Sequence, residues 1–257
     1  MSGIIYSEKS WIESHPDDDE AEEGVFVDMF ADPDPLSTFT YDFPSLPTIT
    51  LTCIHPSNGQ TLDSTGLTIW RAAPQLSSFL ASNPALIAGK RVLELGGGLG
   101  LCSVTAAKLS PSAVVCTDGD TEVLAAMRSN VASNFSSGDA TVDCRQCIWG
   151  ENLSPLASAI GDRFDVIIGA DIIYVPEILE PLFRTVKRFL KEEGGKFILS
   201  YARRNVKIDY VHDMAKAFGF EWYVAFATLF LSSFRCCCCF VWMTQRFAPL
   251  SDAFVAL

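Results

Sequence analysis

An alternation of short apolar runs with amphipathic helical patterns is the feature that most constrains the fold of this 257-residue chain. The β-rich runs span residues 91–95, 113–117, 141–148, 164–169 and 196–201. Helical spacing of apolar side chains separates them, over residues 101–109, 121–133, 176–190 and 206–218. A strand–helix series of this kind favours parallel strands, because each helix carries the chain back over the sheet. The predicted fold class is therefore α/β, a doubly wound sheet covered by helices on both faces.

Further elements are expected on either side of this series. Residues 48–54 alternate apolar and polar side chains as a half-buried strand does, and a helical pattern follows Thr65-Gly66. The apolar stretch 222–243 has the length of a membrane span. Residues 232–235 divide it into two halves, 222–231 and 236–243, both rich in β-compatible side chains, so we predict a buried hairpin in place of a span.

Charge is distributed unevenly along the chain. Between Ser10 and Trp70 there are twelve acidic residues and no Lys or Arg, whereas residues 71–257 carry 18 acidic and 18 basic residues. Residues 1–44 are predicted to be an acidic, largely disordered N-terminal tail. Residues 45–257 are predicted to form the folded domain, with residues 45–89 as a small strand and helix extension. Nucleic acid is not an expected partner, because its binding depends on basic residues that neutralise phosphates.

The cysteines predict reduced thiols inside a cell. There are nine of them, and no basic-then-apolar leader stands at the N-terminus. Cys144 and Cys147 form a CxxC pair, but no second pair or histidine cluster lies at the spacing of zinc ligands. We therefore expect no metal site. The cysteines are interpreted as small buried hydrophobes, and the run 236–239 is placed on a strand buried on both faces.

The strongest chemical signal is an apolar strand that enters a glycine-dense turn, over residues 92–100. Glycine allows a tight turn and a close approach of a ligand to the backbone. Glu94, Gly96, Gly98 and Gly100 follow the pattern E-x-G-x-G-x-G, which differs from the G-x-G-x-x-G of nicotinamide and flavin sites. The acidic side chain would repel a pyrophosphate but suits a ligand with an ammonium and a sulfonium. That combination describes S-adenosylmethionine, and a glycine turn without a ligand is the alternative.

The next predicted strand ends at Asp118, eighteen residues after Gly100. At the carboxyl end of that strand, beside the glycine turn, a carboxylate can accept hydrogen bonds from both ribose hydroxyls of the cofactor. Asp120 is the nearby competitor, and Asp118 is preferred because it directly continues the strand. The alternative is that Asp118 is a solvated turn residue.

The fourth predicted strand ends in Asp171-Ile172-Ile173-Tyr174. In an open α/β sheet the ligand crevice lies outside the carboxyl ends of the strands, so this tetrad should face the transferred methyl. Amino-group methyltransferases of nucleic acids carry a tetrad here with two central prolines, which this chain lacks. Asp171 is predicted to hold an incoming ammonium and Tyr174 to offer a hydroxyl or a ring face to the cation. A strand-end cap and a packed aromatic are the structural alternative.

Four segments resemble the seven-β-strand, class I, non-SET protein-lysine methyltransferases that depend on S-adenosylmethionine. They are residues 66–70 with the helix after them, 92–100, 148–153 and 169–174. The similarity extends over about residues 48–245. It implies that Trp70 and Trp149 border the cofactor, with Trp149 near the adenine. The cofactor-binding residues are thus expected to be Trp70, Glu94, Gly96, Gly98, Gly100, Asp118, Trp149 and Ala170, and the catalytic ones Asp171 and Tyr174.

The resemblance also implies a fold and an activity. The fold is a seven-stranded, Rossmann-like methyltransferase sheet whose last strand is antiparallel, which fits residues 222–245 as the closing hairpin. The activity is methyl transfer to a lysine amine of a protein substrate, such as a chaperone, an elongation factor or a related cytosolic protein. A cytoplasmic monomer, also found in the nucleus, without nucleic-acid or membrane partners, is expected. Methylation of a small molecule or of a histidine or arginine side chain, and a non-catalytic cofactor-binding scaffold, stay open as alternatives.

Overall fold

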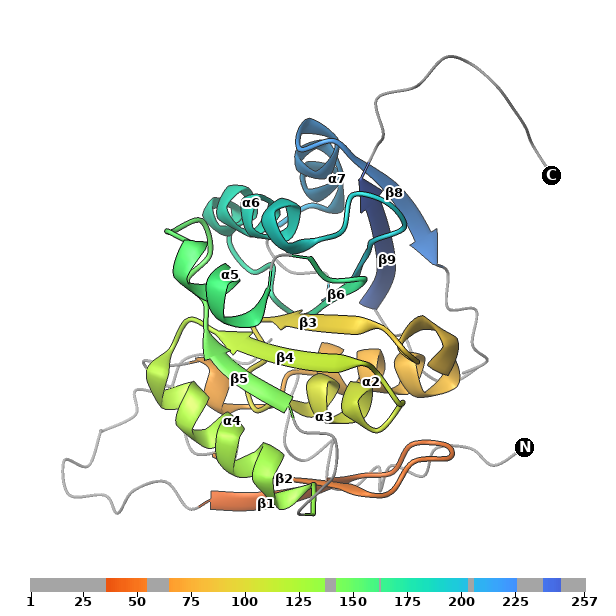
Figure 1. Cartoon of the computed structure of the whole chain (residues 1–257), viewed down its shortest axis with the longest axis vertical. Coiled ribbons are helices and arrows are strands. Elements are labelled where there is room, and N and C mark those ends of the chain that lie inside the picture. The colour runs from red at the N-terminus through yellow and green to blue at the C-terminus, as the bar shows by residue number, and fades with distance from the viewer. Residues whose placement is uncertain are drawn as a thin grey trace, which may run out of the picture.

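The computed structural model describes residues 36–54, 65–136, 142–161, 163–202, 206–225 and 238–245, which build a central sheet with helices on both faces (Figure 1). The described strands form a seven-stranded sheet in the order β5-β4-β3-β6-β7-β9-β8. Its strands are β3 (Arg91–Leu95), β4 (Ala113–Asp118), β5 (Val142–Gln146), β6 (Val166–Ala170), β7 (Lys196–Ala202), β8 (Phe220–Ala225) and β9 (Cys238–Gln245). The first five are parallel, and β9 runs antiparallel to both β7 and β8. The predicted fold class is confirmed.

The strand order reverses at β3, and this reversal positions the site. From β3 the chain moves outward through β4 to β5, and then returns to place β6 on the other side of β3. Crossover connections therefore leave β3 in opposite directions, and a crevice opens outside the carboxyl ends of β3, β4 and β6.

Two hydrophobic cores separate the sheet from the two helix layers. One lies between the sheet and α2 (Ala72–Ser82), α3 (Leu101–Ala107) and α4 (Thr121–Ser133). The other lies under α5 (Ser154–Ile160), α6 (Leu179–Phe189) and α7 (Ile208–Ala217). Short 3₁₀ helices connect these elements at η1 (Thr65–Leu67), η2 (Pro84–Leu86) and η3 (Pro176–Ile178). The helical spacing in the sequence predicted α2, α3, α4, α6 and α7, because each buries an apolar stripe. It missed α5, which buries only Ala157 and Ile160 and therefore shows no extended apolar stripe.

A small two-stranded sheet, β1 (Leu36–Tyr41) and β2 (Ile49–Ile54), covers the α3–α4 side of the molecule (Figure 1). On α4, Asn130 accepts a hydrogen bond from the Thr52 N–H (2.8 Å) and donates one to the Thr52 carbonyl (3.0 Å). Asn134 does the same at Thr50, with distances of 2.9 and 2.7 Å. Four residues of helix and two residues of strand both advance by about 6–7 Å, so the two side chains match the strand in register. Together they satisfy an edge of β2 that would otherwise be unpaired.

The predicted boundary of the N-terminal tail at residue 44 is wrong. Strand β1 lies inside the predicted tail and pairs with β2 along its whole length, from Leu36 opposite Ile54 to Tyr41 opposite Ile49. Tyr41 and Phe43 are buried, and their rings stack with centroids 6.4 Å apart. The six-residue strand carries no strong pattern of its own, and its pairing with β2 creates it. Residues 1–35 of the predicted tail lie outside the described residues.

The predicted closing hairpin is present as β8 and β9, which pair from Phe220 opposite Gln245 to Ala225 opposite Phe240. The turn between them lies outside the described residues, as do the side chains of the predicted buried cysteine run 236–239. Among the described residues, no helix is long and apolar enough to cross a membrane. The part of the stretch 222–243 that the structure describes is strand.

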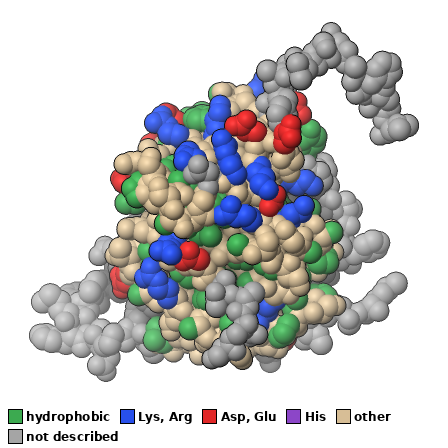
Figure 2. Space-filling model, viewed as in Figure 1, with side chains coloured by type: hydrophobic (Ala, Val, Ile, Leu, Met, Phe, Trp, Pro, Cys, Tyr) green, Lys and Arg blue, Asp and Glu red, His purple; other side chains and the backbone are tan. Residues whose placement is uncertain are grey.

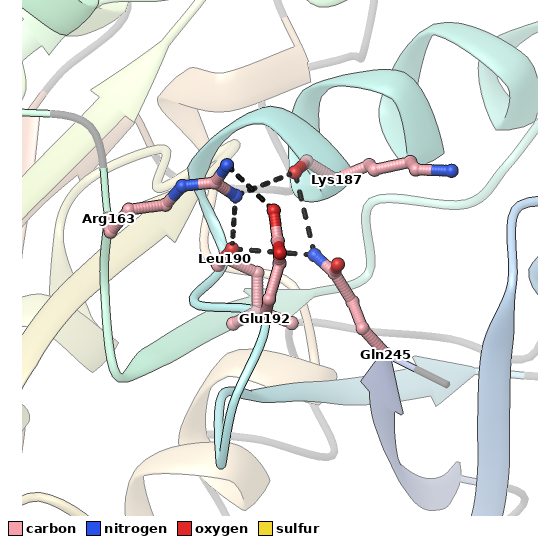
Figure 3. A network of polar contacts seen from close by, with 5 residues as sticks. All are labelled: Arg163, Lys187, Leu190, Glu192 and Gln245. Atoms are coloured by element: carbon pink, nitrogen blue, oxygen red, sulfur yellow. Dashed lines mark hydrogen bonds and ion pairs between the residues drawn. The ribbon is translucent and has the colours of Figure 1, made fainter. Parts of the chain in front are cut away.

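The end of β9 is fastened to the body through a network of polar contacts (Figure 3). Gln245 donates to the carbonyls of Lys187 (3.5 Å) and Leu190 (3.4 Å), at the C-terminal end of α6. Arg163 donates to the same Leu190 carbonyl at 2.9 Å and pairs with Glu192 at 3.0 Å. These side chains satisfy carbonyls that the end of a helix leaves without backbone partners.

On the face seen in Figure 2, Lys and Arg side chains lie interspersed with Asp and Glu.

Candidate functional site

A cleft of about 560 Å³ opens at the carboxyl ends of β3, β4 and β6. It has the size of a small-molecule site. The predicted site residues that line it are Trp70, Glu94, Gly96, Gly98, Asp118, Trp149, Ala170, Asp171 and Tyr174. They come from five separate segments of the chain, so the fold brings together what the sequence placed up to about a hundred residues apart.

The glycine turn forms the floor of the cleft. Gly98 has φ +52°, and a Cβ there would lie 3.2 Å from the carbonyl oxygen of Gly66. Glycine is therefore favoured here both by the left-handed backbone and by the close Gly66 carbonyl, which leaves little room for a Cβ. Gly100 is the one predicted residue that does not line the cleft. It has φ +88° at the start of α3, a left-handed conformation that favours glycine, and a Cβ there would be in ordinary contact with Met127 and Val131 of α4. Gly100 therefore turns the chain into α3.

Glu94 is the most buried carboxyl group of the site, with 2% of its surface exposed. The Ser103 hydroxyl donates a 2.5 Å hydrogen bond to Glu94 Oε2, and the Cys116 thiol lies 3.4 Å from the same oxygen. Burial raises the pKa of Glu94 to about 7, against the opposing effect of the hydrogen bonds from Ser103 and Cys116. The side chain is thus directed mainly beneath the glycine turn, while its edge contributes to the cleft wall.

Asp118 and Asp120 have different roles at the end of β4. The Asp118 carboxylate accepts hydrogen bonds from the N–H of Gly98 (3.0 Å) and of Asp120 (3.2 Å). Asp120 is the N-cap of α4, where its carboxylate accepts from the Glu122 N–H at 2.8 Å. Asp118 is therefore bound directly to the glycine turn, as its predicted role requires. Burial raises the pKa of Asp118, and the backbone hydrogen bonds partly oppose this.

Asp171 follows β6 directly and has a left-handed backbone, with φ +56°. Its N–H donates to the Ser200 carbonyl on β7 at 3.0 Å, and 9% of its surface is exposed. The next residue, Ile172, explains how this uncommon conformation is held. A Cβ on Gly96 would lie 2.7 Å from Ile172 Cγ2, and a Cβ on Gly169 would lie 2.5 Å from Ile172 Cδ1. The Ile172 side chain therefore fills a notch between two glycines and fixes the bend that places Asp171 at the cleft.

The two predicted tryptophans both line the cleft. Trp149 packs so close to Gly96 that a Cβ there would lie 3.2 Å from its ring. Its segment is anchored to α6, because the Gly150 N–H donates to the Thr185 hydroxyl at 3.1 Å. Trp70 donates its ring N–H to the Thr65 carbonyl at 2.9 Å and so closes the η1 segment.

Sequence reasoning missed several residues of the cleft wall. Thr65, Gly66, Thr68 and Ile69 line it from the η1 side, and Ile178 and Pro181 line it from the start of α6. The segment 66–70 carried a signal through the family resemblance, without roles for its individual residues. Ile178 and Pro181 carried none, because an apolar residue at the start of a helix has the same appearance whether it faces a core or a ligand.

Cys147 also lines the cleft, and burial raises the pKa of its thiol to about 12. Cys144 of the same CxxC pair is buried, and burial raises its pKa to about 11. Neither thiol has the ready ionisation of a redox or metal-binding cysteine. Among the residues that the structure describes, no group of three or more His, Cys, Asp or Glu side chains is arranged to hold a metal ion.

With this geometry in place, the chain can be compared with known proteins. Residues 56–217 match the pattern that defines the lysine methyltransferase family. The chain belongs to this family. Lysine methyltransferase membership confirms the resemblance on which the sequence-based expectations rest.

Several curated members of the lysine methyltransferase family are similar to this chain. It is 34% identical over 149 residues to a calmodulin-lysine N-methyltransferase of Arabidopsis thaliana, which covers 57% of this chain and 48% of that protein. It is 34% identical over 147 residues to the protein-lysine N-methyltransferase EFM3 of Chaetomium thermophilum, covering 55% and 44%. With METTL21A, a protein N-lysine methyltransferase of Danio rerio, the identity is 36% over 120 residues, covering 46% and 53%. The chain thus spans about half the length of these relatives.

Solved structures support the fold assignment. A putative S-adenosylmethionine-dependent methyltransferase from Streptococcus mutans superposes with a TM-score of 0.57 at 18% identity, covering 83% of this chain and 56% of that chain. A ribosomal protein L11 methylase from Lactobacillus delbrueckii superposes with a TM-score of 0.51 at 20% identity, covering 70% and 81%. The predicted Rossmann-like methyltransferase sheet is therefore confirmed for this member of the lysine methyltransferase family.

The cleft of this lysine methyltransferase family member fits the cofactor that its sequence predicts. Four acidic residues line it, namely Glu94, Asp118, Asp120 and Asp171, and none of its described lining residues is Lys, Arg or His. Such a set disfavours a phosphate-bearing cofactor and suits a ligand with positive charge and free hydroxyls. Gly96, Gly97 and Gly98 line the cleft without side chains, so the ligand can approach their backbone.

Proposed function

We propose that this protein transfers a methyl group from S-adenosylmethionine to a lysine side-chain amine of a protein substrate. The observation that carries the proposal is the composition of the cleft at the carboxyl ends of β3, β4 and β6. Acidic side chains line it without Lys, Arg or His among its described residues, next to a glycine turn and the tetrad that begins at Asp171. This arrangement suits a cationic cofactor and an incoming ammonium in the same crevice.

The cofactor-binding residues would act through shape and hydrogen bonding. S-adenosylmethionine, when bound, supplies a methyl group on a positively charged sulfur. Asp118, held by the Gly98 N–H, would accept hydrogen bonds from the ribose hydroxyls. Gly96 and Gly98 would let the backbone of the turn approach the ligand, and Trp149 would border the adenine. Glu94 would act from beneath the turn, where its carboxyl group binds Ser103, and its ionised form would favour a cationic ligand.

The substrate lysine must lose its proton before it can react, since its ordinary pKa is about 10.4. Asp171 would attract the ammonium to the cleft, and the surrounding apolar wall would favour the neutral amine by excluding water. Tyr174 would orient the amine by its hydroxyl or by the face of its ring. The fixed bend at Ile172 matters here because an in-line transfer needs the amine close to the methyl and aligned with it.

We further propose a substrate among cytosolic proteins such as chaperones and elongation factors. One relative is named for the lysine methylation of calmodulin, and others are named as protein-lysine methyltransferases, which supports a protein substrate. We propose a monomer located in the cytoplasm, and also in the nucleus, that acts without nucleic-acid or membrane partners. The near balance of acidic and basic residues in 71–257 supports the absence of a nucleic-acid partner.

The test is labelling with S-adenosylmethionine that carries a tritiated methyl group. The full chain is incubated with a cell lysate, and labelled bands are digested and sequenced by mass spectrometry. Methylated lysine in a discrete protein that is absent with Asp118→Ala supports the proposal. A labelled small molecule, or label on a histidine or arginine side chain, would show that the methyl acceptor is that molecule or side chain and not lysine. The absence of any label with an enzyme that binds the cofactor would indicate a scaffold.

A further inference from the structure

Exposed apolar side chains gather at the mouth of the cleft. Six large hydrophobic side chains are notably exposed among the described residues, and three of them are Ile148 (45%), Tyr174 (44%) and Val175 (40%). Ile148 and Tyr174 line the cleft, and Val175 follows Tyr174 directly. We call these three residues the apolar rim. Exposed hydrophobic side chains that gather at one place commonly mark a surface where a partner binds.

The fold holds the two segments of the apolar rim together, although 25 positions separate Ile148 from its nearest companion in sequence. A Cβ on Gly150 would lie 2.7 Å from Pro181 Cβ, so the segment after Ile148 packs directly against the start of α6. The Gly150 hydrogen bond to Thr185 fastens the same contact. Because η3 leads from Val175 into α6, both segments share one rigid support. The rim therefore presents a preformed surface, which keeps the entropic cost of binding small.

Acidic side chains flank the apolar rim. Glu151 follows Gly150, and Glu177 precedes Ile178, a residue of the cleft wall; both glutamates are exposed. Glu180, at the start of α6, is also exposed, and it pairs with Arg184 at 2.6 Å. Its position in the first turn of a helix gives Glu180 a structural role as well. The rim thus combines apolar contact with a surrounding negative potential.

We propose that the apolar rim, with Glu151 and Glu177, docks an extended segment of the substrate protein beside the target lysine. The complementary segment carries an apolar side chain next to that lysine and a further Lys or Arg within a few positions. This inference rests on the proposed lysine methylation and adds to it the chemistry of the residues around the target. Aliphatic and aromatic side chains of the segment would cover Ile148, Tyr174 and Val175, and its second cation would meet the two glutamates.

The experiment uses the full chain, tritiated S-adenosylmethionine and a library of synthetic peptides. Each peptide has one central lysine and no other lysine, and its flanks are apolar and basic, apolar and acidic, polar and basic, or polar and acidic. Basic flanks use arginine, and mass spectrometry assigns the label to the lysine. We expect kcat/KM to be highest for the apolar and basic set, by about tenfold over the polar and acidic set. The preference for basic flanks should weaken as salt is added, because Glu151 and Glu177 are exposed and salt screens their charges.

Substitutions at the rim separate docking from folding. Val175→Ser should raise the KM for apolar-flanked peptides by about tenfold, lower kcat much less, and remove the preference for apolar flanks. Glu177→Gln should remove part of the preference for basic flanks. There are two matched controls. Tyr210→Ser changes a side chain on α7 that is 45% exposed, and Glu193→Gln changes an exposed side chain just before β7, at the amino ends of the parallel strands. Both controls should keep the wild-type preferences.

Different failures have different meanings. If the peptides are methylated at equal rates whatever their flanks, or if Val175→Ser changes all sets by the same factor, the docking inference is overturned and lysine methylation stands. Label in a lysate protein without label in any peptide also overturns docking of an extended segment. If neither peptides nor lysate proteins gain methyl-lysine, the proposed function itself fails, and the docking inference falls with it.

Discussion

The central sheet has an amino edge and a carboxyl edge, where the amino and the carboxyl ends of its parallel strands lie. Carboxyl groups at these two edges have opposite environments. At the amino edge, Asp165 pairs with Lys191 at 2.6 Å and accepts the Arg91 N–H at 2.8 Å. Although partial burial acts to raise its pKa, the hydrogen bonds and charge of these partners hold the pKa of Asp165 below its ordinary value. At the carboxyl edge, burial raises the pKa of both Glu94 and Asp118.

This difference separates the part of the molecule that gains stability from polar contacts from the part that is suited to binding a ligand. Cations at the amino edge satisfy carboxylates and helix carbonyls, as the network in Figure 3 does around Leu190. At the carboxyl edge the described cleft residues include four acidic side chains without a basic one, together with the left-handed backbone of Asp171. The burial of carboxyl groups and an uncommon backbone conformation both cost stability, and both serve a site that receives a cation.

The largest effect is expected from Glu94→Gln, which removes the buried titration. In the folded protein the pKa of Glu94 is about 7, against 4.5 for the unfolded chain. Between these two pH values Glu94 keeps its proton in the folded state and has lost it in the unfolded state. The free energy of unfolding therefore falls as pH rises, and this loss is complete above about pH 7. At 1.36 kcal/mol per pKa unit it reaches about 3 kcal/mol.

Chemical denaturation at pH 5 and pH 8 checks this prediction. The difference in stability between Glu94→Gln and the wild type should shift in favour of the variant from pH 5 to pH 8. An amide placed beside Ser103 has a cost in stability that does not depend on pH. This cost cancels when the stability difference at pH 5 is subtracted from that at pH 8. A difference that is the same at both pH values would show that Glu94 does not titrate in this range.

The second effect concerns catalysis at the strained end of β6. Asp171→Asn keeps the shape of the side chain, and asparagine tolerates the left-handed backbone, so folding and cofactor affinity should persist. Turnover should fall by about 10²-fold if the charge holds the incoming ammonium. Single-turnover rates and melting temperature, measured on the same preparation, decide the matter. Unchanged turnover would leave Asp171 with a structural role alone.

The third effect is on cofactor affinity. Asp118→Ala removes the acceptor of the predicted ribose hydrogen bonds, and the affinity for S-adenosylmethionine should fall at least tenfold by calorimetry. The wild-type affinity should itself decrease at acidic pH, because the raised pKa of Asp118 brings its protonation closer to neutrality. Asp165→Asn serves as the control, since its carboxylate lies at the other edge, and it should leave the affinity unchanged. Equal losses in both variants would contradict the division between the edges.

The smallest effect is expected from Asp165→Asn on stability. A carboxylate whose pKa is lowered by folding contributes stability above its unfolded pKa, and that contribution is lost as pH falls through the folded pKa. Because the side chains of Lys191 and Asp165 are 42% and 23% exposed, solvent screens the pair, and we expect a loss of less than about 1 kcal/mol at pH 7. Thermal unfolding at pH 7 and pH 3 should show this loss shrinking toward pH 3, the opposite of the trend at Glu94.

Sequence patterns predicted the elements whose periodicity is local. Strands β3 to β7 and helices α2, α3, α4, α6 and α7 each bury an apolar face that repeats within one segment. The same is true of the glycine turn and of Asp118, since a turn and a strand end are determined by a few adjacent residues. For this reason the sequence indicated both the fold class and nine of the residues that line the cleft.

Other features depend on partners that are distant in the chain. Strand β1 exists because β2 pairs with it, and β2 is stabilised in turn by Asn130 and Asn134 on α4. The bend at Asp171 is held because Ile172 finds a notch between Gly96 and Gly169, which are more than seventy positions apart. No local pattern encodes such contacts.

The amino-acid sequence by itself thus determined the sheet, its helix layers and the acidic, glycine-rich character of the cleft, because local periodicity and residue chemistry suffice for these. Tertiary structure alone decided that Glu94 is directed beneath the turn toward Ser103, that Gly100 lies outside the cleft, and that Ile148 and Tyr174 line the same cleft. The physical reason is that burial and proximity are properties of the folded chain, and they set the pKa, the backbone strain and the exposed surface of each residue.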